Sequence, residues 1–232
     1  MIFRQMFEQN SSTYTYLLAD ENSSEALLID PVLEHLQQYL ELLRDLNLTL
    51  KFALDTHLHA DHITALGALR EATGCTTMMG VESQAPCVSR NFVQDDRIVI
   101  GAVELEVLHT PGHTDDSYCF LLRGEQQPWL FSGDTLLIRG TGRTDFQNGD
   151  AAVQYQSLLR LLRELPENTL VYPGHDYKGW TVTTLGEERR CNPRLQVSSQ
   201  DEYVRLMDNL HLPHPAQMDV AVPANRQCGA GL

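Results

Sequence analysis

The sequence predicts an α/β fold in which two β-sheets pack face to face and helices cover their outer faces. Short apolar runs between turn residues predict strands, and apolar stripes with a period of about 3.6 residues predict helices. Strands followed by a helix occur in both halves of the chain, which favours two similar layers. The length of 232 residues and the hydrophobic content of 42% fit one large domain with a substantial core.

The first half is expected to hold four strands and two helices. Residues 10–12 and 22–24 are turn-forming Asn and Ser that separate the first strands. Leucines spaced three or four residues apart follow Asp30-Pro31 and predict a helix, and Gly74 ends the second helix. The expected strands are residues 2–7, 14–18, 26–29 and 51–54, and the expected helices are residues 33–46 and 63–72.

The second half repeats this succession and then changes in character. Asp150 is expected to cap a helix whose apolar face includes Leu158 and Leu161. From about residue 180 the chain is rich in Arg, Pro and Asn, with a short helix expected over 201–210. We therefore predict a single domain over 1–232, with residues 180–232 as a small C-terminal extension packed on it. The expected strands are residues 98–100, 103–108, 118–122, 129–131 and 170–172.

Charge and cysteine content limit the partners and the compartment. The net charge of −14 repels phosphate backbones and anionic lipids, so neither nucleic acid nor a membrane is expected as a partner. Five scattered cysteines without a Cys-x-x-Cys pair argue against a disulfide framework and a thiolate zinc site. The N-terminus lacks the pattern of a signal or transit peptide, and no run of 18 apolar residues occurs. We expect a cytoplasmic protein.

The segment Thr56-His-Leu-His-Ala-Asp-His62 places three imidazoles and one carboxylate within six residues. It lies in the loop between an expected strand and an expected helix. Imidazole and carboxylate are ligands of zinc, iron, manganese and nickel. We estimate the chance of this pattern arising at random at about one in a thousand for the whole chain. The segment therefore predicts a metal site, with His57, His59, Asp61 and His62 as candidate ligands.

Three more donors stand at the ends of later strands, in short turns: His113, Asp134 and His175. Strand ends are rigid while their loops are exposed, so donors that converge there can form an open metal site. The spacing alone allows all seven donors to hold one metal or two. Three other histidines lack this context and are expected at the surface: His35, His211 and His214.

These donors, in this order and at these strand ends, resemble the metallo-β-lactamase superfamily over essentially the whole chain. The resemblance implies an αββα sandwich of two mixed sheets with the metal site along one edge. Longer segments outside the donors are similar to the persulfide dioxygenases, which oxidise glutathione persulfide with O₂ and water to sulfite and glutathione. The segments that carry this second similarity are residues 136–146, 172–179, 187–189, 192–195 and 221–225.

The resemblance to the dioxygenases implies one Fe(II) per chain, held by His57, His113 and Asp134. Two imidazoles and one carboxylate leave positions open, as expected of a non-haem iron oxygenase. The remaining donors would then orient water and the iron ligands through hydrogen bonds. These remaining donors are His59, Asp61, His62 and His175. A homodimer is a further expectation from the resemblance.

Two alternative functions stay open. A glyoxalase II-like hydroxyacylglutathione thioester hydrolase of the same superfamily would use two metals and a bridging hydroxide. Residues 139–146 and 192–195 favour the dioxygenase over this hydrolase. A non-catalytic metal-binding protein on the same fold is the second alternative, and the unbroken donor set argues against it.

Substrate binding requires a local basic pocket, because glutathione persulfide is an anion and the chain carries a charge of −14. Seven arginines lie between residues 139 and 194, and arginine suits bidentate capture of carboxylates. We therefore expect four residues of this region to contact the substrate: Arg139, Arg143, Tyr177 and Arg194.

Overall fold

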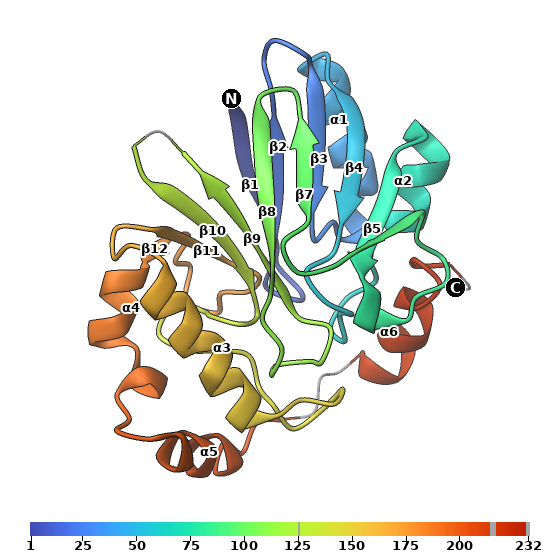
Figure 1. Ribbon diagram of the computed structural model, residues 1–232. Coiled ribbons are helices and arrows are strands. Elements are labelled where there is room, and N and C mark those ends of the chain that lie inside the picture. Colours follow the sequence, from blue (N-terminus) through green and yellow to red (C-terminus); the bar gives the residue numbers. More distant parts are fainter. Residues whose placement is uncertain (125, 214–216, 231–232) are drawn as a thin grey trace.

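The computed structural model describes residues 1–124, 126–213 and 217–230 and consists of two six-stranded sheets with helices outside them (Figure 1). The predicted αββα sandwich is therefore confirmed. Within the described residues no helix is long and apolar enough to cross a membrane.

The first sheet has the strand order β1-β2-β3-β4-β5-β6. Strands β1 to β3 are antiparallel, and β3 to β6 run parallel, so the sheet is mixed. The last two strands were not predicted, because neither shows a two-residue alternation and β6 has only three residues. The strands are β1 (Ile2–Glu8), β2 (Thr13–Ala19), β3 (Glu25–Ile29), β4 (Thr49–Leu54), β5 (Thr76–Gly80) and β6 (Arg90–Phe92).

The second sheet has the order β12-β11-β10-β9-β8-β7, with only β10 and β11 parallel among its described strand pairs. The parallel pair brings the ends of β10 and β11 to the same edge, where Asp134 and His175 follow. The strands are β7 (Arg97–Ile100), β8 (Val103–His109), β9 (Tyr118–Arg123), β10 (Pro128–Gly133), β11 (Leu170–Pro173) and β12 (Thr183–Thr184).

Several helices begin or end at residues that favour helix capping. The Asp150 carboxylate accepts hydrogen bonds from the Ala152 and Val153 amides at the start of α3, as predicted. Gly74 ends α2 with a positive φ of 73°. The helices are α1 (Leu36–Asp45), α2 (Leu66–Thr73), α3 (Ala151–Glu164), α4 (Leu185–Cys191), α5 (Gln200–Asp208) and α6 (Met218–Asn225), with short 3₁₀ turns at Leu33–His35, Val81–Ser83 and Pro193–Leu195.

The main core lies between the two sheets and is rich in aromatic rings. Tyr16 of β2 and Phe131 of β10 are almost fully buried, and their ring centroids lie 5.0 Å apart. Phe3 reaches the same cluster from β1, with its ring centroid 5.0 Å from that of Tyr172. Burying each such ring contributes roughly 1.5–3 kcal/mol to the free energy of folding. The packed rings therefore hold the two sheets, and the loops at their ends, in fixed positions relative to each other.

The C-terminal region divides between the two sheets (Figure 1). Tyr203 of α5 is fully buried in one core with Leu158 of α3. Ala221 and Ala224 of α6 instead pack on Ile63, beside the first sheet. Helices α4 and α6 were not predicted, because α4 has only seven residues and α6 contains a proline at position 223.

One disulfide, Cys87–Cys228, corrects the expectation drawn from the scattered cysteines. It joins the segment between β5 and β6 to the end of the described chain, across a sequence separation of 141 residues. Spacing along the sequence cannot reveal such a pair, because only the fold brings the two residues together. The other three cysteines are free thiols: Cys75, Cys119 and Cys191.

Candidate metal centre

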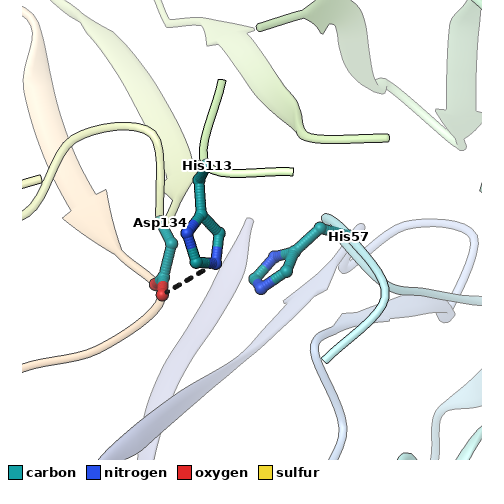
Figure 2. Close-up of side chains that lie close together, drawn as sticks. All are labelled: His57, His113 and Asp134. Atoms are coloured by element: carbon teal, nitrogen blue, oxygen red, sulfur yellow. Dashed lines mark ion pairs between the residues drawn. The ribbon is translucent and has the colours of Figure 1, made fainter. Parts of the chain in front are cut away.

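Three predicted donors from separate loops meet at one edge of the sandwich. His57 follows β4, His113 follows β8 and Asp134 follows β10, and Figure 2 shows their side chains converging. One ligand atom from each lies within 4.8 Å of the others, and His113 Nε2 is 3.6 Å from Asp134 Oδ2. We call these three residues the donor triad.

The other polar atoms of the two triad imidazoles are already hydrogen-bonded. His57 Nδ1 lies 3.0 Å from the Thr56 hydroxyl, and His113 Nδ1 donates to the Arg143 carbonyl at 2.6 Å. These contacts orient both rings and leave each Nε2 facing the centre. Such outer hydrogen bonds are typical of histidines that bind metals.

Asp134 is oriented in the same way by His175. His175 Nδ1 donates to Asp134 Oδ1 at 2.6 Å, so Oδ2 is the oxygen that faces the triad. His175 Nε2 in turn lies 2.9 Å from Asp61 Oδ2. Both ring nitrogens of His175 are therefore used within the protein, although the sequence made it a candidate donor.

The remaining donors form a second group next to the first. His59, Asp61 and His62, which we call the second trio, also offer ligand atoms within 4.8 Å of one another. Both His59 Nδ1 and His62 Nε2 are buried without a hydrogen-bond partner. Because buried polar atoms are rarely left unpaired, these two nitrogens mark a place that a water or a second ion could fill.

The charges of the donor triad suit a cation. Burial lowers the pKa of His57 well below its usual value, and the neighbouring His59 and His113 lower it further. Burial alone would raise the pKa of Asp134, but the charge and hydrogen bond of His175 outweigh it and hold that pKa below the usual range. A neutral imidazole and an ionised carboxylate are the protonation states that metal binding requires.

Two neighbouring histidines favour their charged forms instead. Burial opposes the charge on His175, but Asp134 and Asp61 outweigh burial and raise its pKa well above the usual value. Burial likewise opposes the charge on His59, and Asp30 outweighs it, which raises the pKa to about 9. A metal bound by either ring would have to displace a proton that these carboxylates stabilise.

A cavity of about 630 Å³ opens beside the donor triad. A cavity of this size fits a molecule as large as a short peptide. All four predicted substrate contacts line it: Arg139, Arg143, Tyr177 and Arg194.

The three arginines differ in how much of their hydrogen-bonding capacity is free. Arg139 forms ion pairs with Glu187 and the fully buried Glu188. Arg143 is held in a two-bond ion pair with Asp145, at 2.6 and 2.8 Å.

In the described part of the chain, the Arg194 guanidinium donates only to the carbonyl and the hydroxyl of Thr141, the latter at 3.0 Å. Among the described residues no carboxylate lies within ion-pair distance of Arg194. Burial lowers its pKa, as expected for a poorly hydrated cation. Of the three cavity arginines, Arg194 is therefore the one best able to bind the carboxylate of a substrate.

Sequence reasoning missed several residues of the site. Thr13 bonds to His175 Nε2 at 3.1 Å, and Gln147 and Lys178 line the cavity. Thr13 and Gln147 stand far from every donor in the sequence, so only the fold could place them there, whereas Lys178 follows His175 by three residues and could have been proposed. Of the histidines expected at the surface, His35 is half-buried and His211 is exposed, and His214 lies outside the described residues.

Comparisons with known proteins identify the family of the chain. The metallo-beta-lactamase superfamily matches residues 10–87 and 88–175. The mitochondrial persulfide dioxygenase ETHE1 of Mus musculus is 48% identical over 230 residues, which is 99% of this chain and 89% of that protein. A crystal structure of ETHE1 from Myxococcus xanthus is 53% identical and superimposes with a TM-score of 0.94, covering 99% of this chain and 100% of the other.

A hydrolase is also among the relatives. A probable hydroxyacylglutathione hydrolase of Schizosaccharomyces pombe is 35% identical, with 88% of this chain and 94% of that protein covered. Its identity is clearly lower than that of the ETHE1 proteins. The chain thus belongs to the metallo-beta-lactamase superfamily and is homologous to persulfide dioxygenases over 99% of its residues.

Proposed function

We propose that the protein is a persulfide dioxygenase that oxidises glutathione persulfide with O₂ and water to sulfite and glutathione, releasing two protons. The observation that carries this proposal is a triad of two imidazoles and one carboxylate in a chain homologous to persulfide dioxygenases over its full length.

The donor triad fits one Fe(II). His57 and His113 each present one nitrogen, Asp134 presents one oxygen, and this set is typical of non-haem iron oxygenases. A ferrous ion held there would supply open coordination positions and redox chemistry with O₂. The hydrogen bond from His175 keeps the Asp134 carboxylate in one orientation.

His175 also links the donor triad to Asp61, because its two ring nitrogens bond to Asp134 Oδ1 at 2.6 Å and to Asp61 Oδ2 at 2.9 Å. Tyr177 stacks on His175 with the ring centroids 6.2 Å apart and forms part of the cavity wall.

The glutathione moiety would occupy the cavity. Its carboxylates need cationic partners, and we propose Arg194 as the first of these because its guanidinium has no carboxylate partner among the described residues. Arg143 would make a second contact only in competition with Asp145. Arg139 is held by Glu187 and Glu188, so we propose that it mainly shapes the cavity wall.

A two-metal thioester hydrolase is the second candidate function. The unpartnered nitrogens of His59 and His62 and the hydrolase from Schizosaccharomyces pombe favour it. Against it, a second metal would have to displace the protons of His59 and His175 and break the bonds of Asp61 to its neighbours. A homodimer and a cytoplasmic location stay predictions.

The two candidates predict different products from glutathione conjugates. The iron-loaded protein is given glutathione persulfide while O₂ uptake and sulfite are measured, and hydroxyacylglutathione in a parallel assay. We expect one sulfite per O₂ consumed and little thioester hydrolysis. Rapid thioester hydrolysis without O₂ uptake would instead establish the hydrolase.

A further inference from the structure

The C-terminal segment, residues 218–229, packs against the loop of residues 57–64, which carries His57 and the second trio. We propose that Asn225 in this segment is a positioning residue that holds the loop in the shape its imidazoles require. This inference rests on the proposed metal centre, since it concerns the loop that contributes one member of the donor triad.

The Asn225 side chain is fully buried and uses all of its hydrogen-bonding groups on the loop. Its Oδ1 accepts from the Thr64 amide at 2.9 Å. Its Nδ2 donates to the carbonyls of His59 at 2.9 Å and His62 at 2.8 Å. One side chain thus fixes three backbone groups, two of which belong to candidate donors.

The loop needs such external partners because it is neither helix nor strand. Side chains in the middle of the loop bond to Asp30, Thr13 and His175, but among the described residues its other backbone hydrogen bonds lie towards its two ends. The Leu58 amide donates to Asp116 Oδ2 at 2.9 Å, and the Ile63 carbonyl accepts from the Leu33 amide at 2.8 Å. Without the Asn225 side chain, the carbonyls of His59 and His62 would lose their hydrogen-bond donor. Because an unpaired buried carbonyl costs free energy, the loop would then favour a different conformation.

Two glycines allow the C-terminal segment to approach this closely. A Cβ atom at Gly67 would lie 2.6 Å from the Cys228 carbonyl oxygen, which accepts from the Gly67 amide at 2.9 Å. A Cβ atom at Gly229 would lie 2.2 Å from the Thr64 carbonyl oxygen, and Gly229 has a φ of +80°. The backbone of residues 228–229, which follow Asn225, is therefore in direct contact with the end of the loop and with the start of α2.

Further contacts hold the segment itself in place. Ala221 and Ala224 of α6 pack on Ile63 of the loop. The Cys87–Cys228 disulfide ties the end of the segment to the chain between β5 and β6. Asn225 thus lies in a segment that is anchored both before and after it. Residues 221–225 therefore have a structural role, although none of them is a candidate metal ligand.

The test compares Asn225→Ala with Leu161→Ala, which loses packing in the separate core beneath α3. Protein loaded with Fe(II) without oxygen is mixed with a colour-forming chelator, and the rate of iron release is measured. Hydrogen exchange of residues 57–66 is measured in the metal-free proteins. We expect Asn225→Ala to release iron at least about tenfold faster and to exchange faster in this loop. Leu161→Ala should show neither change, even if its melting temperature falls as far.

Gly67→Ala is the second variant, because it displaces the Cys228 carbonyl while keeping Asn225. We expect it to accelerate iron release and loop exchange as well. Native release and native loop exchange in Asn225→Ala, or in Gly67→Ala if the first variant does not fold, would overturn the proposal. Loop exchange in the metal-free protein does not depend on dioxygenase activity, so failure of the proposed function would be seen separately.

Discussion

Replacing Arg194 by alanine is predicted to weaken the binding of glutathione persulfide while leaving the metal centre intact. The guanidinium lines the cavity, is half-buried, and is bonded only to the carbonyl and hydroxyl of Thr141 among the described residues. It can therefore accept a substrate carboxylate without first losing an ion pair.

The magnitude follows from the kind of bond that is lost. A hydrogen bond to a charged group contributes about 1.5–3 kcal/mol. At about 1.4 kcal/mol per tenfold change, KM should rise by roughly 10–100-fold. The Arg194→Lys variant should recover only part of this loss, since an ammonium keeps the charge but not the planar pair of donors. The effect of Arg143→Ala should be smaller, because Asp145 already occupies that guanidinium.

The assay is initial-rate O₂ uptake over a range of glutathione persulfide concentrations, with iron content measured on the same samples. Arg189→Ala is the matched control: it removes the same charge from an exposed arginine that pairs with Glu167 and does not line the cavity. Added salt should raise KM more in the native protein than in Arg194→Ala. A native KM in Arg194→Ala, or an equal rise in Arg189→Ala, would refute this assignment.

Three further predictions concern the metal centre and the core. Alanine at any member of the donor triad should abolish iron retention, measured by metal analysis, because only two protein ligands would remain. His59→Ala and Asp61→Ala should keep most of the iron and lower turnover by about 10–100-fold, whereas complete loss of iron would show that they are ligands. Burial raises the pKa of Tyr203 from 10.0 to about 12, so the neutral phenol stabilises the fold below pH 10 and this contribution is lost as pH rises to about 12. Tyr203→Phe should therefore unfold less steeply with pH over that interval, as followed by circular dichroism.

The sequence indicated candidate donors that the fold brings together, because they are concentrated at strand ends. The His57–His62 segment stands between a strand and a helix that both have clear periodicity, and His113 and Asp134 follow strands with the same signal. Hydrophobic patterning therefore predicted that these side chains stand at strand ends, and the resemblance to the metallo-β-lactamase superfamily implied that those ends meet at one edge of the sandwich. This placement of the candidate donors was possible because local sequence signals lie beside them.

Features that depend on contacts between distant segments could not be predicted. The Cys87–Cys228 bond and the hydrogen bonds of Asn225 join residues more than 100 positions apart. Helix α6 was missed because Pro223 is a helix-breaking signal, although packing on Ile63 stabilises the helix in the fold. Tertiary packing decided these features, and local propensity does not report it.

Spacing alone does not choose among the seven donors, and the choice of His57, His113 and Asp134 came from the resemblance to the dioxygenases. On spacing alone His175 and Asp134 are equivalent strand-end donors. The structure shows His175 with both ring nitrogens bonded to carboxylates, whereas Asp134 keeps one oxygen facing the triad. Hydrogen-bond partners distinguish a proposed ligand from a residue that orients it.

The central claim is that one iron per chain, held by the donor triad, supports oxidation of glutathione persulfide. The most direct test is to titrate metal-free protein with Fe(II) in the absence of oxygen and to measure, at each addition, bound iron and subsequent sulfite formation. The account predicts that sulfite formation rises in proportion to bound iron and stops rising at one iron per chain. Activity that appears only as a second metal binds, or thioester hydrolysis in place of sulfite formation, would contradict it.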